Sequence, residues 1–210
     1  MKNYSGKLIT LEGNEGCGKS TQIRLLYEVL RKKSLPVVLT REPGGTAVSD
    51  AIRQVLLEPR NKRMTPECET LLYMASRAQL IAEVVLPELQ KGRIVLCDRW
   101  LDATVAYQGY GHGVSIDWIR SLGRAVTQGA RPALSLYLDL PVRLGLRRAT
   151  SHKRADRMER KSTAFHEKVR RGYLAISRQE PGRFKRIPLR ESDTVEAVHK
   201  KILKEVSCVV

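Results

Sequence analysis

Eight residues near the start of the chain have the types and spacing of a loop that binds phosphate. They run from Gly13 to Ser20 and read Gly-Asn-Glu-Gly-Cys-Gly-Lys-Ser. The glycines let the backbone wrap with its N–H groups pointing inward, and Lys19 is a mobile cation for the outer phosphates. The hydroxyl of Ser20 is an oxygen ligand of the kind that Mg2+ prefers. The segment therefore predicts binding of a nucleoside triphosphate with Mg2+.

The segments on both sides of this loop support that interpretation. The apolar run at residues 7–11 predicts a buried strand, and residues 21–30 predict a helix. A helix that begins here points the positive end of its dipole at bound phosphate. The alternative is a plain Gly-rich turn between strand and helix, but the complete spacing with both flanks favours the phosphate loop.

Charged side chains also follow two later predicted strands. One strand ends in Asp98 and Arg99, and another leads into Arg41 and the turn at residues 43–45. In a parallel sheet such strand ends lie at one edge, where ligands bind. A carboxylate there holds Mg2+, usually through water, and arginine forks suit phosphate oxygens. Because the loop, Lys19 and Mg2+ already serve one triphosphate, the extra arginines indicate a second phosphorylated ligand, and hence a kinase rather than a simple hydrolase.

The elements that must position these residues alternate along the chain. Short apolar runs predict strands at residues 8–12, 37–40, 94–98 and 134–139, with a weaker fifth at 184–187. Amphipathic patterns predict helices at residues 19–33, 46–57, 66–90, 115–127, 141–149, 163–179 and 194–206, and residues 99–114 receive no element. This alternation predicts an α/β fold of the P-loop NTPase type: a five-stranded parallel sheet flanked by helices, in a single domain over residues 1–210.

The composition indicates where such a protein works. No segment is apolar over the length of a membrane span, and the N-terminus lacks the apolar centre of a signal peptide. The four cysteines are scattered without a C-x-x-C pair, which favours free thiols over disulfides or zinc. We therefore expect a cytoplasmic protein that does not bind a membrane.

The formal net charge of +16 is concentrated late in the chain. Residues 143–190 hold 16 Lys or Arg and four Asp or Glu, an excess of 12 positive charges. In a nucleotide-binding chain this suggests a segment that closes over phosphates. A basic P-loop ATPase that binds nucleic acid has the same electrostatic footprint and is an alternative. That class needs stacking aromatic side chains, and the segment has only Phe165, Tyr173 and Phe184. We therefore expect no specific nucleic acid as a partner.

Several segments together resemble bacterial thymidylate kinase, in collinear order from about residue 7 to 205. The specific one is Arg-Glu-Pro-Gly-Gly-Thr at residues 41–46, because many unrelated NTPases share the phosphate loop. Asp98-Arg99 and Ala-Tyr-Gln-Gly at residues 106–109 also match. Asp-Arg-Met-Glu at residues 156–159 matches the family's lid. The resemblance implies a homodimeric enzyme that phosphorylates dTMP to dTDP with ATP and Mg2+, for dTTP biosynthesis.

The resemblance also assigns site residues. The residues that bind ATP would be Gly13, Asn14, Glu15, Gly16, Cys17, Gly18, Lys19, Ser20 and Thr21, and the metal would be held by Ser20 and Asp98. Tyr73 would stack on thymine and Arg77, one helical turn away, would donate to its exocyclic oxygen. Ordinary core packing is the alternative for Tyr73. Glu12 would lie near the sugar and phosphate of dTMP. The acceptor would also be contacted by Arg41, Arg99, Thr104, Tyr107 and Gln108.

A basic lid at about residues 147–160 is expected to supply a cation to the transferring phosphoryl group. Gly16 stands where some thymidylate kinases carry a basic residue in the loop, so the loop of this chain cannot supply the cation. We expect Arg148 first and Arg154 second in this role, and Arg157 paired with Asp156 or Glu159 instead. The predicted catalytic set is completed by Lys19, Arg99 and Glu12.

Three positions depart from the family pattern around the base. Tyr73 stands where Phe is usual, Trp100 where Tyr, Phe or His follows Asp-Arg, and Ala103 where serine is frequent. None of them touches phosphate chemistry. A related kinase with another acceptor, such as dUMP, CMP or a nucleoside, is therefore an alternative.

Overall fold

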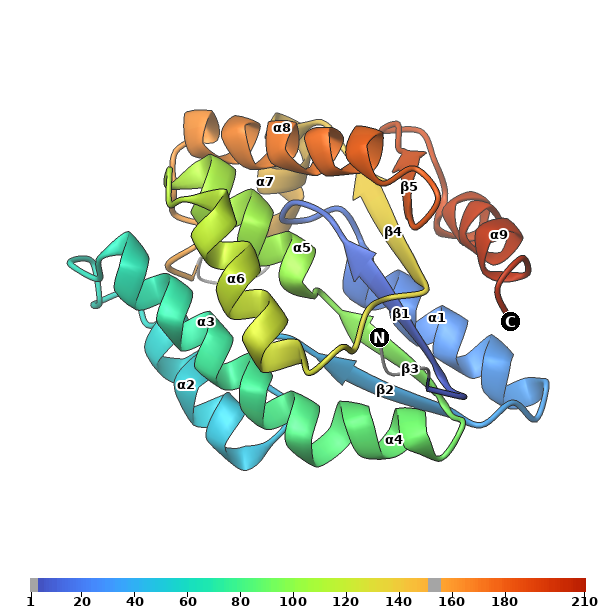
Figure 1. Cartoon of the computed structure of the whole chain (residues 1–210). Helices are drawn as coiled ribbons and strands as arrows, with labels where there is room; N and C mark the ends of the chain where they lie inside the picture. Colours follow the sequence, from blue (N-terminus) through green and yellow to red (C-terminus); the bar gives the residue numbers. More distant parts are fainter. Residues whose placement is uncertain (1–3, 151–155) are drawn as a thin grey trace.

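A five-stranded parallel sheet forms the centre of the computed structural model, which describes residues 4–150 and 156–210 (Figure 1). The strand order is β2-β3-β1-β4-β5, which confirms the predicted α/β fold. The strands are β1 (Lys7–Glu12), β2 (Val37–Arg41), β3 (Ile94–Asp98), β4 (Leu134–Asp139) and β5 (Phe184–Pro188). The α-helices are α1 (Lys19–Lys32), α2 (Ala47–Leu57), α3 (Pro66–Leu80), α4 (Leu86–Gln90), α5 (Leu101–Thr104), α6 (Ile116–Thr127), α7 (Val142–Thr150), α8 (Thr163–Gln179) and α9 (Val195–Val206), and two π-helical segments are η1 (Ile81–Val85) and η2 (Val105–Gly111).

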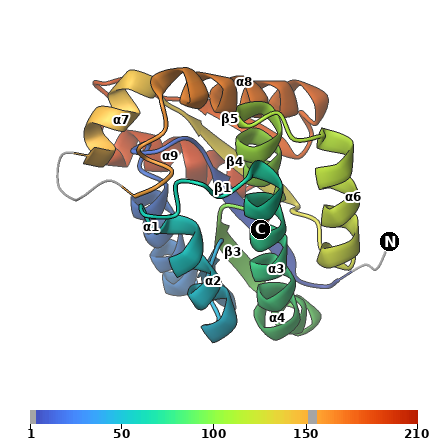
Figure 2. The same ribbon diagram turned by 90° about the vertical axis from the view of Figure 1, so that its left-hand side faces the viewer.

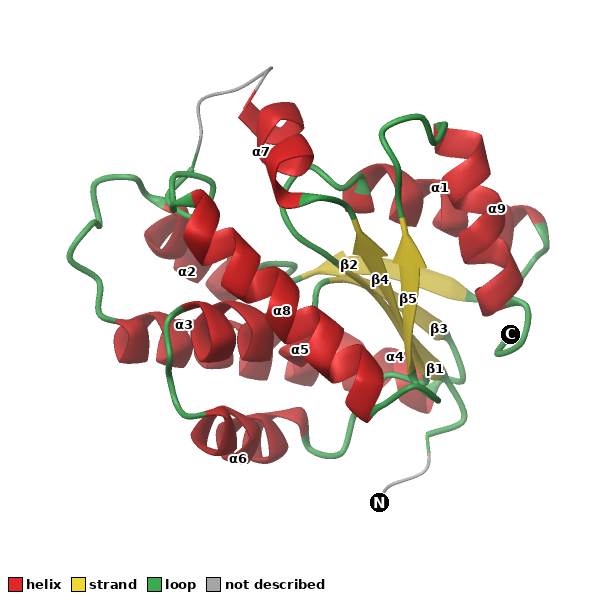
Figure 3. Cartoon of the chain, turned by 90° about the horizontal axis from the view of Figure 1, so that it is seen from above, coloured by secondary structure: helices red, strands yellow, loops and turns green. Residues whose placement is uncertain are grey.

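Both faces of the sheet are apolar, and helices cover each of them. Along β1, Ile9 and Leu11 join the core cluster beneath α1 and α9, whereas Leu8 joins a cluster on the opposite face. Figure 3 shows α1 and α9 on one side of the strands, with α3, α5 and α8 on the other. Since side chains alternate along a strand, a strand covered on both faces must be apolar at nearly every position. This is why short apolar runs located the strands.

Side chains that accept hydrogen bonds mark where five of the helices begin. Each accepts from the backbone N–H three residues later, which satisfies a donor that the first helical turn leaves unpaired. These caps bring the predicted helix starts to within one residue of the observed ones. The capping residues are Thr46, Thr65, Ser115, Ser162 and Thr194.

The long helix predicted at residues 66–90 is present but not uniform. It begins as α3, passes through η1 and ends as α4. The change in winding comes just before Pro87, which has no backbone N–H to donate to the preceding turn. Within residues 4–150 and 156–210, no helix combines the length and apolar character that a membrane span requires.

The prediction of no helix or strand at residues 99–114 is wrong. The chain is helical there, first as α5 and then as the π-helical η2. Glycines at 109 and 111 and β-branched residues at 104 and 105 have low helix propensity, which hid the helix. Packing against α8 overrides that propensity. The packing is so close at Gly111 that a Cβ there would lie 2.7 Å from the ring of Phe165.

Candidate functional site

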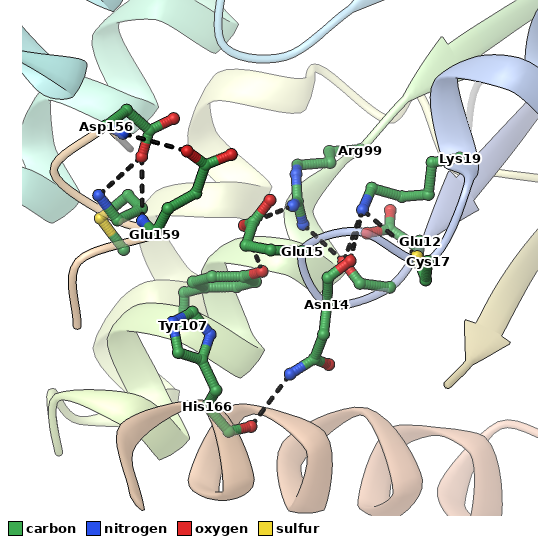
Figure 4. Close-up of polar contacts among 12 residues, drawn as sticks. Glu12, Asn14, Glu15, Cys17, Lys19, Arg99, Tyr107, Asp156, Glu159 and His166 are labelled. Carbon is green, nitrogen blue, oxygen red and sulfur yellow. Dashed lines mark hydrogen bonds and ion pairs between the residues drawn. The ribbon is translucent and has the colours of Figure 1, made fainter. Parts of the chain in front are cut away.

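The phosphate loop lies between β1 and α1, with its glycines in conformations that other residues rarely adopt. Gly16 and Gly18 have φ angles of 66° and 88°, and Gly18 caps the start of α1. Lys19 is folded over the loop rather than extended into solvent, with only 7% of its surface exposed. Its Nζ donates to the carbonyl oxygens of Gly13 (2.9 Å) and Asn14 (2.8 Å) (Figure 4). The ammonium group is therefore held at the centre of the loop, where bound phosphate would meet it.

The two predicted metal residues lie together. Ser20, in the first turn of α1, donates from its Oγ to Asp98 Oδ2 at 2.9 Å. Asp98 is the last residue of β3, which pairs with β1 in the sheet. It therefore lies beside the end of β1, where the phosphate loop begins. A hydroxyl and a carboxylate at the mouth of a phosphate loop are the hard oxygen donors that suit Mg2+. The arrangement fits that ion.

Glu15, at the tip of the loop, is the centre of a charged cluster (Figure 4). Its Oε1 accepts from Arg99 Nη2 and from the hydroxyl of Tyr107, each at 2.8 Å. Burial alone would raise the pKa of Glu15, but the positive charge of Arg99 and the hydrogen bond from Tyr107 help to lower it to about 2. Arg99 also donates to Gly13 O at 2.8 Å, which fixes its guanidinium beside the loop.

Glu12 lies beneath the site rather than in it. Its side chain is fully buried, and the hydroxyl of Tyr173 approaches Oε2 at 3.3 Å. Among the described residues, Oε1 has no hydrogen-bond partner. Burial, reinforced by the nearby charge of Asp102, raises the pKa of Glu12 well above its ordinary value. The structure thus separates two carboxylates three residues apart.

A cavity with about 540 Å³ of empty volume opens beside Glu15, and we refer to it as the small cavity. Six of the eight residues predicted to contact the acceptor line it, and they come from α3, α5, η2 and the residue after β3. They are Tyr73, Arg77, Arg99, Thr104, Tyr107 and Gln108. Its mixture of aromatic and polar walls is typical of a site for one small molecule.

Arg77 is held in the wall of the small cavity by a buried ion pair. Its Nη2 lies 2.6 Å from Glu42 Oε2, and both side chains are almost inaccessible. The same nitrogen donates to Thr104 Oγ1 at 3.0 Å. Burial raises the pKa of Glu42 even though Arg77 opposes the shift. These contacts fix the direction of the guanidinium, whose Nη1 donates to the sulfur of Met74 at 3.2 Å.

Other residues of the small cavity were not identified from sequence. Glu42 lies in the Arg-Glu-Pro-Gly-Gly-Thr segment, so that motif could have signalled it. Arg53, on α2, donates to Pro43 O at 2.7 Å, and no motif points to it. Of the remaining lining residues, Glu15 was expected in the phosphate loop, Trp100 and Ala103 around the base, and Asp156 and Met158 in the lid. No role was assigned from sequence to Glu42, Pro43, Arg53 and Leu57.

A second, larger cavity runs along the phosphate loop and is here called the large groove. The loop and the start of α1 line it, together with Arg41, Arg148 and Asp98. Figure 2 shows α7 and α2 on the same side of the molecule, near the start of α1. Arg53 and Asp156 line both cavities, so the two adjoin. Glu12 lines neither of them in the part of the chain that the structure describes.

The predicted basic residues of the lid differ in where they lie. Arg148, exposed on α7, lines the large groove and donates to Glu191 O at 3.3 Å. Arg154 lies outside the described residues. The pairing expected for Arg157 is wrong: its Nη1 forms a buried ion pair with Glu69 Oε2 of α3 at 2.5 Å. Arg41 lines the large groove and not the small cavity, and its exposed guanidinium pairs with Asp50.

Comparisons with known proteins agree over almost the whole chain. A family model described as thymidylate kinase matches residues 11–202. The chain is 51% identical over 186 residues to a thymidylate kinase of Geotalea daltonii, which covers 85% of this chain and 87% of the relative. It is 45% identical over 199 residues to one of Exiguobacterium sp., covering 95% and 93%. The crystal structure of thymidylate kinase from Ehrlichia chaffeensis matches with a TM-score of 0.78 at 30% identity, covering 96% of this chain and 98% of that one.

Proposed function

The chain belongs to the thymidylate kinase family, and from this membership we propose how its two cavities perform the family's reaction, the ATP-dependent phosphorylation of dTMP to dTDP. The small cavity takes the acceptor, dTMP, and the large groove takes ATP. The observation that carries this assignment is that the two cavities adjoin at Arg53 and Asp156, with the phosphate loop at the junction.

The thymine base of dTMP enters the small cavity between Tyr73 and the wall formed by η2. Tyr73 is half-buried and can stack on a base, while Arg77 donates to an exocyclic oxygen of thymine. The ion pair with Glu42 holds Arg77 in that direction before dTMP arrives. Thr104 and Gln108 complete the polar rim of the base site.

The sugar and phosphate of dTMP face the phosphate loop. Glu15, ionised at neutral pH, lines the small cavity and accepts from the sugar hydroxyl, whereas the resemblance implied that Glu12 would lie near the sugar and phosphate. Arg99 and Arg53 line the cavity on the same side as the junction and supply charge to the phosphate. Arg41 would contribute only from the rim of the large groove. Glu12 acts from beneath, as a buried support for the loop.

ATP is bound through the loop N–H groups and Lys19, and Ser20 and Asp98 are the residues that would hold Mg2+. The metal neutralises charge on the donor phosphates when it is bound. The acceptor phosphate oxygen is already nucleophilic at neutral pH, so no dedicated base is required. Lys19, Arg99 and Arg148 then position the reacting groups and stabilise charge on the transferring phosphoryl group. Arg154 remains a second candidate for the cation from the lid.

The chain is proposed to act as one kinase domain over residues 1–210, with a lid at about 147–160, as a homodimer in the cytoplasm. Exposed Val48 and Val55 on α2, with Leu71 on α3, support an apolar contact between copies. The four free cysteines in the described residues support a reducing compartment.

The proposal is tested by incubating the protein with ATP, Mg2+ and one nucleoside monophosphate at a time, and measuring ADP formation. We expect dTMP to be the best acceptor. We expect dUMP to be poorer by about 1–3 kcal/mol in transition-state binding, because it lacks one methyl group. If CMP, AMP or GMP outruns dTMP, the assignment of the base site fails even though kinase activity survives.

A further inference from the structure

Glu69 is a buried carboxylate that belongs to neither cavity but contacts residues from two walls of the small cavity. It lies on α3 one turn before Tyr73, and only 1% of its surface is exposed. Within the described ranges it lines neither the small cavity nor the large groove. Its side chain is therefore enclosed by other protein groups and not open to a ligand.

The first wall that Glu69 reaches is η2. Its Oε1 accepts from Gln108 Nε2 at 2.6 Å, and Gln108 lines the small cavity. A carboxylate can only accept hydrogen bonds, so it selects the NH2 end of the amide and directs the carbonyl end elsewhere. His112 Nε2, at the end of η2, lies 3.4 Å from the same oxygen. Glu69 thus fixes how Gln108 presents its amide.

The second wall is the segment at residues 156–159. Oε2 of Glu69 pairs with Arg157 Nη1 at 2.5 Å, while Arg157 Nε donates to Leu56 O of α2 at 2.6 Å. Arg157 thereby docks this segment against α2 and α3. Its two neighbours, Asp156 and Met158, line the small cavity. One carboxylate consequently holds wall residues that lie 48 positions apart in the chain.

The electrostatics of Glu69 agree with such a role. Burial alone would raise its pKa, but the nearby imidazole of His112 and the charge of Arg157 help to lower it to about 2. The group is therefore ionised throughout the neutral range. A neutral replacement would leave the buried guanidinium of Arg157 without its counter-charge, which is unfavourable in a site that excludes water.

We propose that Glu69 is a positioning residue for the acceptor nucleotide, holding Gln108 and the 156–158 wall at the spacing that fits dTMP. The inference rests on the proposed function of the small cavity. Glu69 does not touch the nucleotide, so its contribution reaches dTMP through Gln108 and Met158. It should govern the affinity for dTMP and not the chemistry at the phosphate loop.

The test is Glu69→Gln, which keeps the shape and removes the charge. Its matched control is Glu88→Gln, the same change at an ion-paired glutamate on α4 that is outside both cavities. We expect the KM for dTMP to rise about 10- to 100-fold. We expect kcat at saturating dTMP and the KM for ATP to stay within about three-fold of native. The control should match the native enzyme in all three constants.

A double variant separates positioning from general damage. If Glu69 acts partly through Gln108, the two changes should not be independent. Relative to the native enzyme, the double variant Glu69→Gln, Gln108→Ala should then raise the KM for dTMP by less than the product of the two single-variant factors. Multiplicative effects, an unchanged KM for dTMP, or a loss confined to kcat would overturn the proposal. Should Glu69→Gln fail to fold, Arg157→Lys is measured instead; a raised KM for dTMP then supports the proposal and an unchanged one overturns it.

Measurements on the native enzyme separate failure of the proposed function from failure of the positioning role of Glu69. If native protein shows no dTMP-dependent ADP formation, the proposed function fails and this inference fails with it. If native protein is active and Glu69→Gln has a native KM for dTMP, only the positioning role of Glu69 is lost.

Discussion

Glu12 and Glu15 show how three residues of separation change the chemistry of a carboxyl group. The charge of Arg99 and the hydrogen bond from Tyr107 help to lower the pKa of Glu15 to about 2. Burial raises the pKa of Glu12, one of whose oxygens has no hydrogen-bond partner among the described residues. A lowered pKa means that the ionised form stabilises the fold at all pH values above the ordinary 4.5. A raised pKa means that the fold favours the neutral form.

These environments predict opposite outcomes for the same substitution. At pH 7, Glu15→Gln should lower the free energy of unfolding by roughly 2–3 kcal/mol and the melting temperature by about 5–10 °C. Its deficit relative to native should shrink as the pH falls from 4.5 towards 2. Glu12→Gln should leave the melting temperature unchanged or raise it, because Gln mimics the neutral carboxyl. Equal destabilisation by both changes, measured by thermal unfolding, would contradict the account.

Arg53 and Arg41 provide a second comparison at the scale of single residues. Arg53 lines both cavities and is held by Pro43 O, while Arg41 is exposed, lies only in the large groove and pairs with Asp50. Arg53→Ala should therefore raise the KM for dTMP by about 10-fold or more. Arg41→Ala should have a clearly smaller effect. If initial-rate kinetics show the larger increase in KM for Arg41→Ala, Arg41 and not Arg53 contacts the acceptor.

The resemblance to thymidylate kinase, more than the residue types alone, identified six of the 15 residues that line the small cavity. Six predicted side chains line it because the motifs that carry them end on strands or helices that meet at one edge of the sheet. Arg53 escaped because an arginine within an amphipathic helix has no distinguishing pattern. Glu12 was preferred to Glu15 because only the fold shows which of two acidic residues the end of β1 buries.

At the scale of elements, α7 packs directly against the phosphate loop through glycine. A side chain on Gly145 of α7 would meet Glu15 O at 2.4 Å, and one on Gly16 would meet Gly145 O at 2.0 Å. Neither position has room for a Cβ while the elements stay in place. This contact keeps Arg148, one turn further along α7, beside the large groove.

Gly145→Ala should consequently move α7 away from the loop. We expect kcat/KM for ATP to fall by about 10-fold or more, since displacement of a positioning element by about 1 Å can have such an effect. Gly182→Ala is the matched control, because a Cβ there meets nothing within 4 Å. Steady-state kinetics that show equal activity for both variants would remove the packing of α7 from the mechanism.

Elements were predictable where local signals and packing agree. Apolar runs gave the five strands, and capping residues such as Thr46 and Ser162 gave helix starts. The helix formed by α5 and η2 was missed because it is stabilised by packing against α8. Since α8 lies far along the chain, no local pattern indicates that contact. That helix carries Thr104, Tyr107 and Gln108, so the missed element holds half of the predicted acceptor residues that line the small cavity.

For the whole molecule, several arginines of the basic segment form ion pairs inside the fold, with acidic partners that the net charge of +16 already counts. Arg170 and Arg186 both pair with Asp139, and Arg183 pairs with Asp102. These ion pairs join α8 and β5 to β4, and α5 to the residue that precedes β5. The basic segment therefore has a structural use besides the phosphate chemistry expected of it, which composition alone could not separate.

The central claim is that dTMP occupies the small cavity with its phosphate facing the loop at the junction with the large groove. The most direct measurement is a crystal structure of the native protein with dTMP bound. The account predicts thymine against Tyr73, a base oxygen within hydrogen-bond distance of Arg77, and phosphate beside Arg99 and Arg53. A structure with dTMP elsewhere and the small cavity empty, or with the base at the loop and the phosphate beside Tyr73, would contradict it.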